Sequence, residues 1–157
     1  MKTEFEARIL EIDVAAITKT LEALGAEKVA DRELRRFVYD LEPGNDDAWI
    51  RLRTDGTIST FTIKERRAEA IDGMRELEVV VGDFETAGFL LERLGHLPRW
   101  RQENRRTSYV LDGIEIEIDS WPLIPTYLEI EGRSVGEVLV SFSNLNAHVS
   151  QKNPLAG

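Results

Sequence analysis

The sequence predicts an α+β protein in which helices cover the apolar side of an antiparallel β-sheet. Segments that alternate charged and apolar residues recur along the chain, and amphipathic segments with helical spacing separate them. Two Asp-Gly pairs also lie between alternating segments, where they predict tight hairpins. Because hairpins join antiparallel neighbours, we expect an antiparallel sheet.

The expected elements follow one another from the N-terminus. Residues 4–9 alternate as a strand, with Glu4, Glu6 and Arg8 on one face. Residues 13–24 form a helix that Asp13 caps and Gly25 ends. The remaining predicted elements are strands at 34–41, 49–54, 57–64 and 75–81, a helix at 83–94, a hairpin over 105–119, a strand at 127–131 and a helix from Ser134 to about His148. We expect one domain over residues 1–150 and a tail at 151–157.

The sequence contains an internal repeat in which several residues recur 70 positions later. Asp13, Gly25 and Arg36, for example, recur as Asp83, Gly95 and Arg106. Each half therefore reads as a Glu-x-Glu strand, a helix and an Arg-Arg strand. This repetition predicts a pseudo-symmetric sheet rather than two independent domains.

Counting outward from the Asp55-Gly56 turn assigns side chains of the first hairpin to faces. A two-residue turn pairs Thr54 with Thr57. The count then gathers three basic side chains on one face: Arg51, Arg53 and Lys64. A tight turn at Asp72-Gly73 would put Lys64 on the wrong face for Glu76 and Glu78, so we expect a longer loop or bulge within residues 65–74.

The Asp112-Gly113 turn assigns the second hairpin in the same way. It pairs Ser108 with Glu117 and Arg106 with Asp119, so Arg106 rather than Arg105 lies on the charged face. The last strand, with Glu129 and Glu131, repeats the opening pattern.

These charged faces allow two arrangements. Either the sheet is open and its charged face is exposed to solvent, or the sheet closes on itself and its charged face lines a water-filled tunnel. A closed tunnel would suit a polyphosphate held by Arg and Lys and divalent cations held by Glu and Asp.

Composition excludes several classes of protein. A net charge of -9 argues against a nucleic-acid polymer or an acidic membrane as partner, so an anionic substrate needs a local basic site. The absence of cysteine excludes disulfides and thiolate metal sites. Because no signal core or membrane-spanning run is present, we expect a cytoplasmic protein.

The motifs together resemble the CYTH superfamily of triphosphate tunnel metalloenzymes. The residues that carry the resemblance span nearly the whole chain in order: Glu4-x-Glu6-x-Arg8, Arg51-x-Arg53, Lys64, Glu76-x-Glu78, Arg106-x-x-Tyr109, Asp119 and Glu129-x-Glu131. The resemblance implies a closed, eight-stranded antiparallel β-barrel with helices packed on the outside.

The resemblance also implies roles for individual residues. The phosphate-binding residues would be Arg8, Arg51, Arg53, Lys64 and Arg106, of which Arg8, Lys64 and Arg106 are the catalytic candidates. The ligands of Mg or Mn, expected as two ions, would be Glu4, Glu6, Glu129, Glu131 and Asp119. The supporting carboxylates would be Glu76, Glu78 and Glu117.

Two positions depart from the pattern of the family. The first motif normally ends in Lys, whereas Arg8 keeps the charge but does not accept a proton near neutral pH. Asn104 stands two residues before Arg106, where relatives often have a basic residue, and Arg101 or Arg105 is a candidate to compensate.

Three functions remain open. The first is that of a class IV adenylate cyclase, which converts ATP to cyclic AMP and pyrophosphate. The second is a triphosphatase acting on thiamine triphosphate or inorganic triphosphate, and the third is a module that binds triphosphate or polyphosphate without turnover. The resemblance also leaves room for a homodimer, for which no residue here argues.

Overall fold

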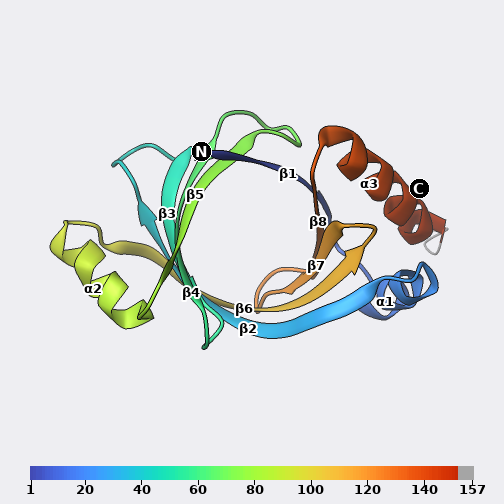
Figure 1. Ribbon diagram of the computed structural model, residues 1–157, viewed down its shortest axis with the longest axis horizontal. Helices are drawn as coiled ribbons and strands as arrows, with labels where there is room; N and C mark the ends of the chain where they lie inside the picture. The colour runs from blue at the N-terminus through green and yellow to red at the C-terminus, as the bar shows by residue number, and fades with distance from the viewer. Residues whose placement is uncertain (152–157) are drawn as a thin grey trace. The chain divides into compact units, whose positions relative to one another are not determined.

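A computed structural model of the protein describes residues 1–151, with side chains up to residue 148 (Figure 1). The elements are β1 (Lys2–Ile9), α1 (Val14–Ala23), β2 (Glu27–Asp40), β3 (Ala48–Thr54), β4 (Ser59–Arg66), β5 (Met74–Val81), α2 (Phe84–Arg93), β6 (Pro98–Leu111), β7 (Ile114–Ser120), β8 (Tyr127–Gly132) and α3 (Val135–Gln151). The tail predicted at 151–157 lies, beyond Gln151, outside the described residues.

The strands form a closed antiparallel barrel in the order β1-β5-β4-β3-β2-β6-β7-β8. The predicted fold class is therefore confirmed, and the open sheet is excluded. No helix within the described residues combines the length and the apolar character needed to cross a membrane.

The chain divides into two compact units, Met1–Glu4 with Arg32–Asn104 and Phe5–Asp31 with the chain from Arg105 onward. The predicted repeat reappears in the element lengths. Helices α1 and α2 have 10 residues each, β2 and β6 have 14, and β3 and β7 have seven. Asp13 and Asp83 each accept a hydrogen bond from the backbone three residues later, as predicted helix caps do.

In the first unit, α2 packs on the apolar face of its sheet. Phe84 and Leu91 of α2 join Tyr39, Ile50 and Leu52 in a buried core. The side chains that alternate with these along β3 carry the charges, because neighbours along a strand point to opposite faces. Burial of the apolar face therefore fixes where the charged face of this unit lies.

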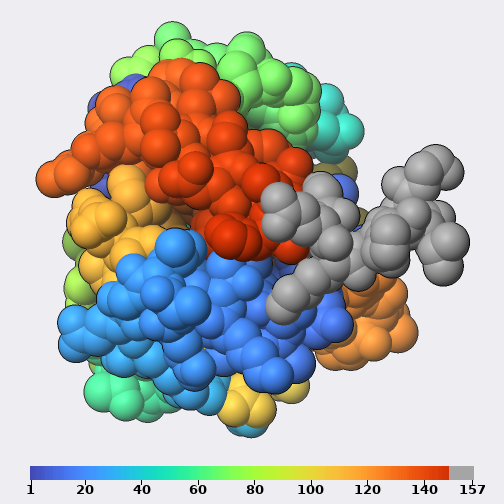
Figure 2. All heavy atoms as spheres, turned by 90° about the vertical axis from the view of Figure 1, so that its right-hand side faces the viewer, coloured from blue at the N-terminus to red at the C-terminus, as the bar shows by residue number. Residues whose placement is uncertain are grey.

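In the second unit, α1 and α3 lie beside each other (Figure 2). Helix α3 also contacts β7 and β8, and Ile116, Leu128 and Ile130 of these strands are almost completely buried. A Cβ at Gly132 would lie only 3.0 Å from Val138 of α3. Because neighbours along a strand point to opposite faces, the charged residues of β7 and β8 lie on the face of the sheet that α3 does not cover.

The strand register of the first hairpin is shifted by two residues from the predicted register. Thr54 pairs with Ser59 rather than with Thr57, so the turn is a four-residue loop. The side chain of Asp55 accepts backbone hydrogen bonds from Thr57 and Ile58, at 2.8 and 2.7 Å, and thereby stabilises the longer loop. A shift of two residues preserves the face of every side chain, because the strand period is two.

The loop between β4 and β5 is long, as predicted. It covers residues 67–73, and the register beyond it pairs Lys64 with Glu76 on one face. A Cβ at Gly73 would lie 1.9 Å from the carbonyl oxygen of Ala68, so the loop requires glycine here. The loop thus brings Lys64 to the same face as Glu76.

Both β2 and β6 begin seven residues before the predicted strands. In the second unit, Arg105 donates two hydrogen bonds to Asp31, at 2.9 and 2.6 Å. These bonds lower the pKa of Asp31 to about 2. The pair links Asp31, in the early part of β2, to Arg105 in the middle of β6.

We predict that Asp31→Asn lowers stability at neutral pH by at most about 1 kcal/mol, because the pair is largely exposed. The folded pKa lies below the ordinary value of 3.8, so the contribution is present above 3.8 and disappears as the pH falls toward 2. Melting temperatures across this range test it, with Glu33→Gln on the same strand as control. A deficit that is equal at every pH would contradict the assignment.

Candidate functional site

Each unit carries one charged face. The basic face of the first unit comprises Arg36, Arg51, Arg53 and Lys64, with the carboxylates of Glu4, Glu76 and Glu78. The acidic face of the second unit comprises Glu6, Glu117, Asp119, Glu129 and Glu131, with Arg8 and Arg106. Together the faces contain every residue predicted for the site, and Arg36 in addition.

A buried ion pair lies at one end of the basic face. Lys64 Nζ lies 3.0 Å from Glu4 Oε2, and the two residues are 9% and 5% exposed. Glu76 stands opposite Lys64 in the strand register. Burial, together with the charge of Glu4, raises the pKa of Glu76. This end therefore combines one buried cation with two carboxylates.

The centre of the basic face is built around Arg51. Its guanidinium lies 3.3 Å from Glu78 Oε2, which also accepts a 2.7 Å hydrogen bond from Thr62. Arg51 Nε and Thr60 Oγ1 are buried but have no hydrogen-bond partner within the described residues. Buried donors usually have a partner, so these two atoms are suited to a ligand with acceptor oxygens.

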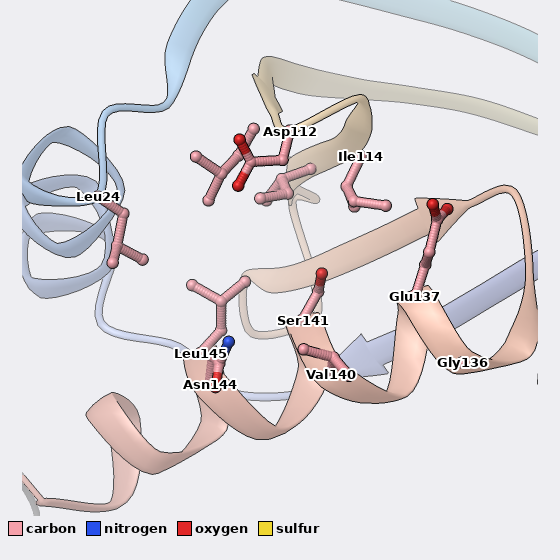
Figure 3. A pocket seen from close by; sticks show the side chains of 11 residues that line it. Leu24, Asp112, Ile114, Gly136, Glu137, Val140, Ser141, Asn144 and Leu145 are labelled. Atoms are coloured by element: carbon pink, nitrogen blue, oxygen red, sulfur yellow. The ribbon is translucent and has the colours of Figure 1, made fainter.

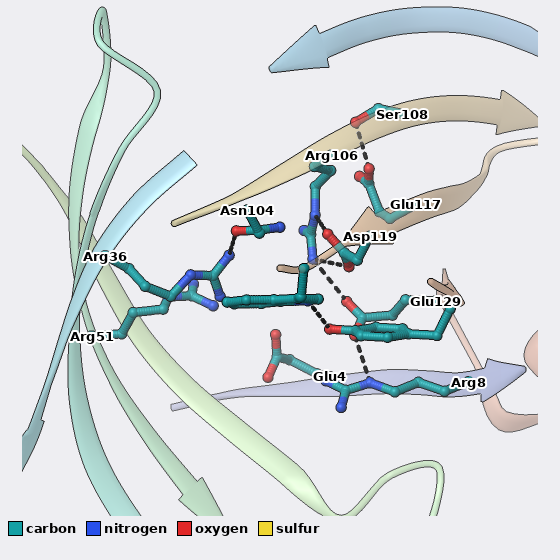
Figure 4. Close-up of polar contacts among 12 residues, drawn as sticks. Glu4, Arg8, Arg36, Arg51, Asn104, Arg106, Ser108, Glu117, Asp119 and Glu129 are labelled. Atoms are coloured by element: carbon teal, nitrogen blue, oxygen red, sulfur yellow. Dashed lines mark hydrogen bonds and ion pairs between the residues drawn. The ribbon is translucent and has the colours of Figure 1, made fainter. Parts of the chain in front are cut away.

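The far end of the basic face holds Arg36, which the sequence analysis did not include in the site. Arg36 is 8% exposed and stands directly opposite Arg53. It donates a 2.8 Å hydrogen bond to Oδ1 of Asn104, which is 6% exposed (Figure 4). Counting the β2–β3 register outward would have found Arg36, but residues 41–47 between the strands contain no two-residue turn that fixes that register.

On the acidic face, Arg106 and Asp119 form a two-pronged ion pair. Nε and Nη2 of Arg106 donate to the two oxygens of Asp119 at 2.8 and 2.7 Å, and Asp119 is fully buried (Figure 4). Nη2 also lies 3.5 Å from Glu129 Oε1. Burial opposes the charge on Arg106, but the carboxylates outweigh it and raise its pKa, so the residue stays cationic.

Arg8 is a cation held between a carboxylate and an aromatic ring. Its Nε donates to Glu129 Oε2 at 2.9 Å, and its guanidinium lies 5.1 Å from the ring centre of Tyr127. Tyr127 in turn accepts a 3.1 Å hydrogen bond from the indole of Trp121. Although burial opposes the charge, Glu129 and Tyr127 raise the pKa of Arg8, which excludes it as a base near neutral pH.

Carboxylates meet across the strands of the acidic face. The register places Glu131 between Glu6 and Glu115, and Glu117 beside Glu129. Such neighbours have Cβ atoms about 5 Å apart and repel each other when both are charged. Burial raises the pKa of Glu117, which accepts a hydrogen bond from Ser108. Bound cations would relieve this repulsion.

The donor chemistry of the acidic face fits Mg or Mn, since both prefer carboxylate oxygens. Within the described residues, however, no three acidic or histidine side chains converge as a ready ligand set. Arg8 and Arg106 contact Glu129 and Asp119 instead. The face therefore supplies ligands of the right kind, two of which, Glu129 and Asp119, contact arginine in this structure.

Relatives often have a basic residue at the position of Asn104, and neither Arg101 nor Arg105 takes its place on the basic face. Arg105 points away to Asp31, and the guanidinium of Arg101 lies 5.4 Å from the ring centre of Phe37, on the apolar side. The nearby cation on the basic face is Arg36, which Asn104 contacts directly.

A separate cavity of about 520 Å³ lies in the second unit, away from the acidic face (Figure 3). One face of α3, between Gly136 and Leu145, lines it together with Leu24 and the Asp112 turn, and Ile114 and Ile116 add apolar surface. It contains no residue predicted for the site.

A model of the CYTH domain family matches residues 2–144.

Among solved structures, the PH1012 protein of Pyrococcus horikoshii OT3 is similar, with a TM-score of 0.81 and 23% identity over 94% of this chain and 90% of that one. A candidate adenylate cyclase from Vibrio parahaemolyticus has a TM-score of 0.69 and 14% identity over 97% and 88% of the two chains. A candidate adenylyl cyclase from Hippeastrum, described with a dominant triphosphatase activity, has a TM-score of 0.67 and 15% identity over 92% and 87%. Comparison with curated protein sequences gives no match. At these identities the structural likeness shows the fold.

Proposed function

Since the chain belongs to the CYTH family, we propose that it is a divalent-metal-dependent enzyme that acts on a small-molecule triphosphate. The observation that carries this proposal is the basic face of the first unit. Lys64 and Arg36 are buried there, and two buried donors, Arg51 Nε and Thr60 Oγ1, have no partner within the described residues. A polyphosphate offers many charged acceptor oxygens, which suits such a surface.

In this proposal basic side chains bind the phosphate groups and carboxylates hold the cations. The phosphate-binding residues are Arg8, Arg51, Arg53, Lys64 and Arg106. The metal ligands are Glu4, Glu6, Glu129, Glu131 and Asp119, supported by Glu76, Glu78 and Glu117. When bound, Mg or Mn would supply charge neutralisation at the phosphoryl oxygens and at the leaving group.

Arg8 and Arg106 bind and orient phosphate oxygens but do not transfer protons. Their raised pKa values keep both guanidiniums charged at every physiological pH. Lys64 adds a compact charge at its end of the basic face, where Glu4 is its partner until an anion binds. Positioning and charge stabilisation, rather than base catalysis by these three residues, are thus the proposed contributions.

For the reaction itself, we propose cyclisation of ATP to cyclic AMP and pyrophosphate, in keeping with the resemblance to class IV adenylate cyclases. The alternative is hydrolysis of thiamine triphosphate or inorganic triphosphate, which the triphosphatase activity described for the similar Hippeastrum protein favours. Because Arg8 stays protonated, it does not activate the attacking water that this alternative requires.

A product assay separates these reactions. The purified chain is incubated with ATP, thiamine triphosphate and inorganic triphosphate, each with Mg or Mn and with a chelator as control. Cyclic AMP from ATP supports cyclisation, and metal-dependent phosphate release supports hydrolysis. Binding without any product would leave a triphosphate-binding module and contradict the proposal of an enzyme.

A further inference from the structure

The apolar side of the first unit carries an exposed patch, where side chains of β5 and α2 lie beside partly buried side chains of β4. The six residues of this outer patch are Phe61, Ile63, Leu77, Val79, Leu90 and Leu94. The four on β5 and α2 are between 53% and 76% exposed. Contiguous exposed apolar surface of this kind marks interaction sites. We propose that the outer patch binds a second copy of this chain, and that α2 of each copy lies on β4 and β5 of the other.

The internal repeat shows what covers the equivalent face of the second unit. Counting the registers outward from β2 and β6 makes Phe61 of β4 equivalent to Leu128 of β8. On the next strands it makes Val79 of β5 equivalent to Ile9 of β1. Leu128 and Ile9 are 0% and 5% exposed, and α3 packs on β8. The first unit, whose residues are all described, contains α2 but no helix in the place of α3.

The flank of α2 that carries Leu90 and Leu94 faces this uncovered part of the sheet. Helix α2 packs on β3, which lies between β2 and β4. Glu85 extends toward β2, where it pairs with Arg35 at 2.6 Å. At about 100° per residue, Leu90 and Leu94 lie on the other flank of the helix, on the side of β4. In the second unit Leu24, the equivalent of Leu94, lines one cavity together with residues of α3.

Residue types at equivalent positions also differ between the two units. Leu90 stands where α1, which has α3 beside it, carries Thr20. Leu77 stands where β1 carries Ala7. The unit that lacks the covering helix therefore exposes larger apolar side chains, which is the reverse of what a purely solvated surface needs.

The occupant that fits this face is α2 of a second copy. The element absent from the first unit is a helix with an apolar flank, and the outer patch itself contains such a flank, so the surface is self-complementary. Two copies related by a twofold axis can each place this flank on the bare strands of the other. Leu77 and Val79 alternate along β5 with Glu76 and Glu78, so the dimer leaves the basic face open.

Sedimentation equilibrium of the unaltered chain at micromolar concentration tests the proposal, and a dimer is the expected result. Leu77→Glu on the sheet and Leu90→Lys on the helix flank should each weaken dimerisation by at least about 100-fold, because the dimer would bury the new charge twice against apolar side chains. An equimolar mixture of the two variants should form a dimer again, since one contact then pairs Glu with Lys and the other keeps two leucines. A monomeric unaltered chain would overturn the proposal.

Leu123→Glu is the matched control. Leu123 is 95% exposed, belongs to the second unit and lies outside the outer patch, so its replacement should leave dimerisation unchanged. Melting curves verify that each variant folds, and Val79→Glu replaces Leu77→Glu if that variant does not. Equal weakening by the control, undiminished dimerisation of the patch variants, or failure of the mixed variants to pair would contradict an interface in which α2 lies on β4 and β5.

Discussion

Replacement of Arg106 by methionine is expected to destabilise the fold by about 3 to 5 kcal/mol and to abolish turnover. The reason is that Asp119 is fully buried and would lose both hydrogen bonds that it accepts from the guanidinium, and removal of one partner of a buried ion pair typically costs this much. Chemical denaturation at neutral pH measures the loss of stability. A loss below about 1 kcal/mol would show that the pair is not coupled as the geometry indicates.

The double variant Arg106→Met with Asp119→Leu separates stability from function. Because it removes both charges, it should regain most of the unfolding free energy that the single variant loses. Turnover should stay absent, since Arg106 is a proposed phosphate ligand. Activity that returned together with stability would restrict this pair to a structural role.

Replacement of Glu131 by glutamine is expected to lower metal-dependent turnover by about 10- to 100-fold while the fold persists. The amide keeps the size of the side chain but removes the charge that a divalent cation requires, which accounts for a loss of this magnitude. Titration of the rate with Mn measures it, and saturation should move to higher Mn concentration.

Glu115→Gln provides the control for this variant. Glu115 lies directly opposite Glu131 on β7 but is exposed and is not a proposed metal ligand. Its replacement should leave the Mn dependence almost unchanged. Equal effects at the two positions would indicate a general loss of negative charge on the acidic face rather than loss of a ligand.

The faces of the strands could be predicted because turn chemistry and alternation act locally. Asp112 and Gly113 have φ values of 52° and 78°, as a two-residue hairpin requires, and the whole predicted register of that hairpin is confirmed. At Asp55 the predicted turn was two residues too short, because side-chain hydrogen bonds to the loop backbone were not anticipated. Each side chain still lies on its predicted face, because a shift of two residues equals one full period of a strand.

The long strands and Arg36 could not be predicted in the same way. Residues 27–33 and 98–104 are rich in charge and alternate weakly, so their strand conformation depends on pairing with distant strands rather than on local pattern. Arg36 joins the basic face through the β2–β3 register, which no tight turn fixes. The detailed contacts of the carboxylates likewise depend on which arginines lie beside them in three dimensions.

The most direct test of the central claim is calorimetric titration of the unaltered chain with inorganic triphosphate, with and without Mg. If the basic side chains bind phosphates and the carboxylates bind cations, triphosphate should bind, and Mg should tighten the binding by at least about tenfold, or about 1.4 kcal/mol. No binding in either condition, or an affinity that Mg leaves unchanged, would contradict the account.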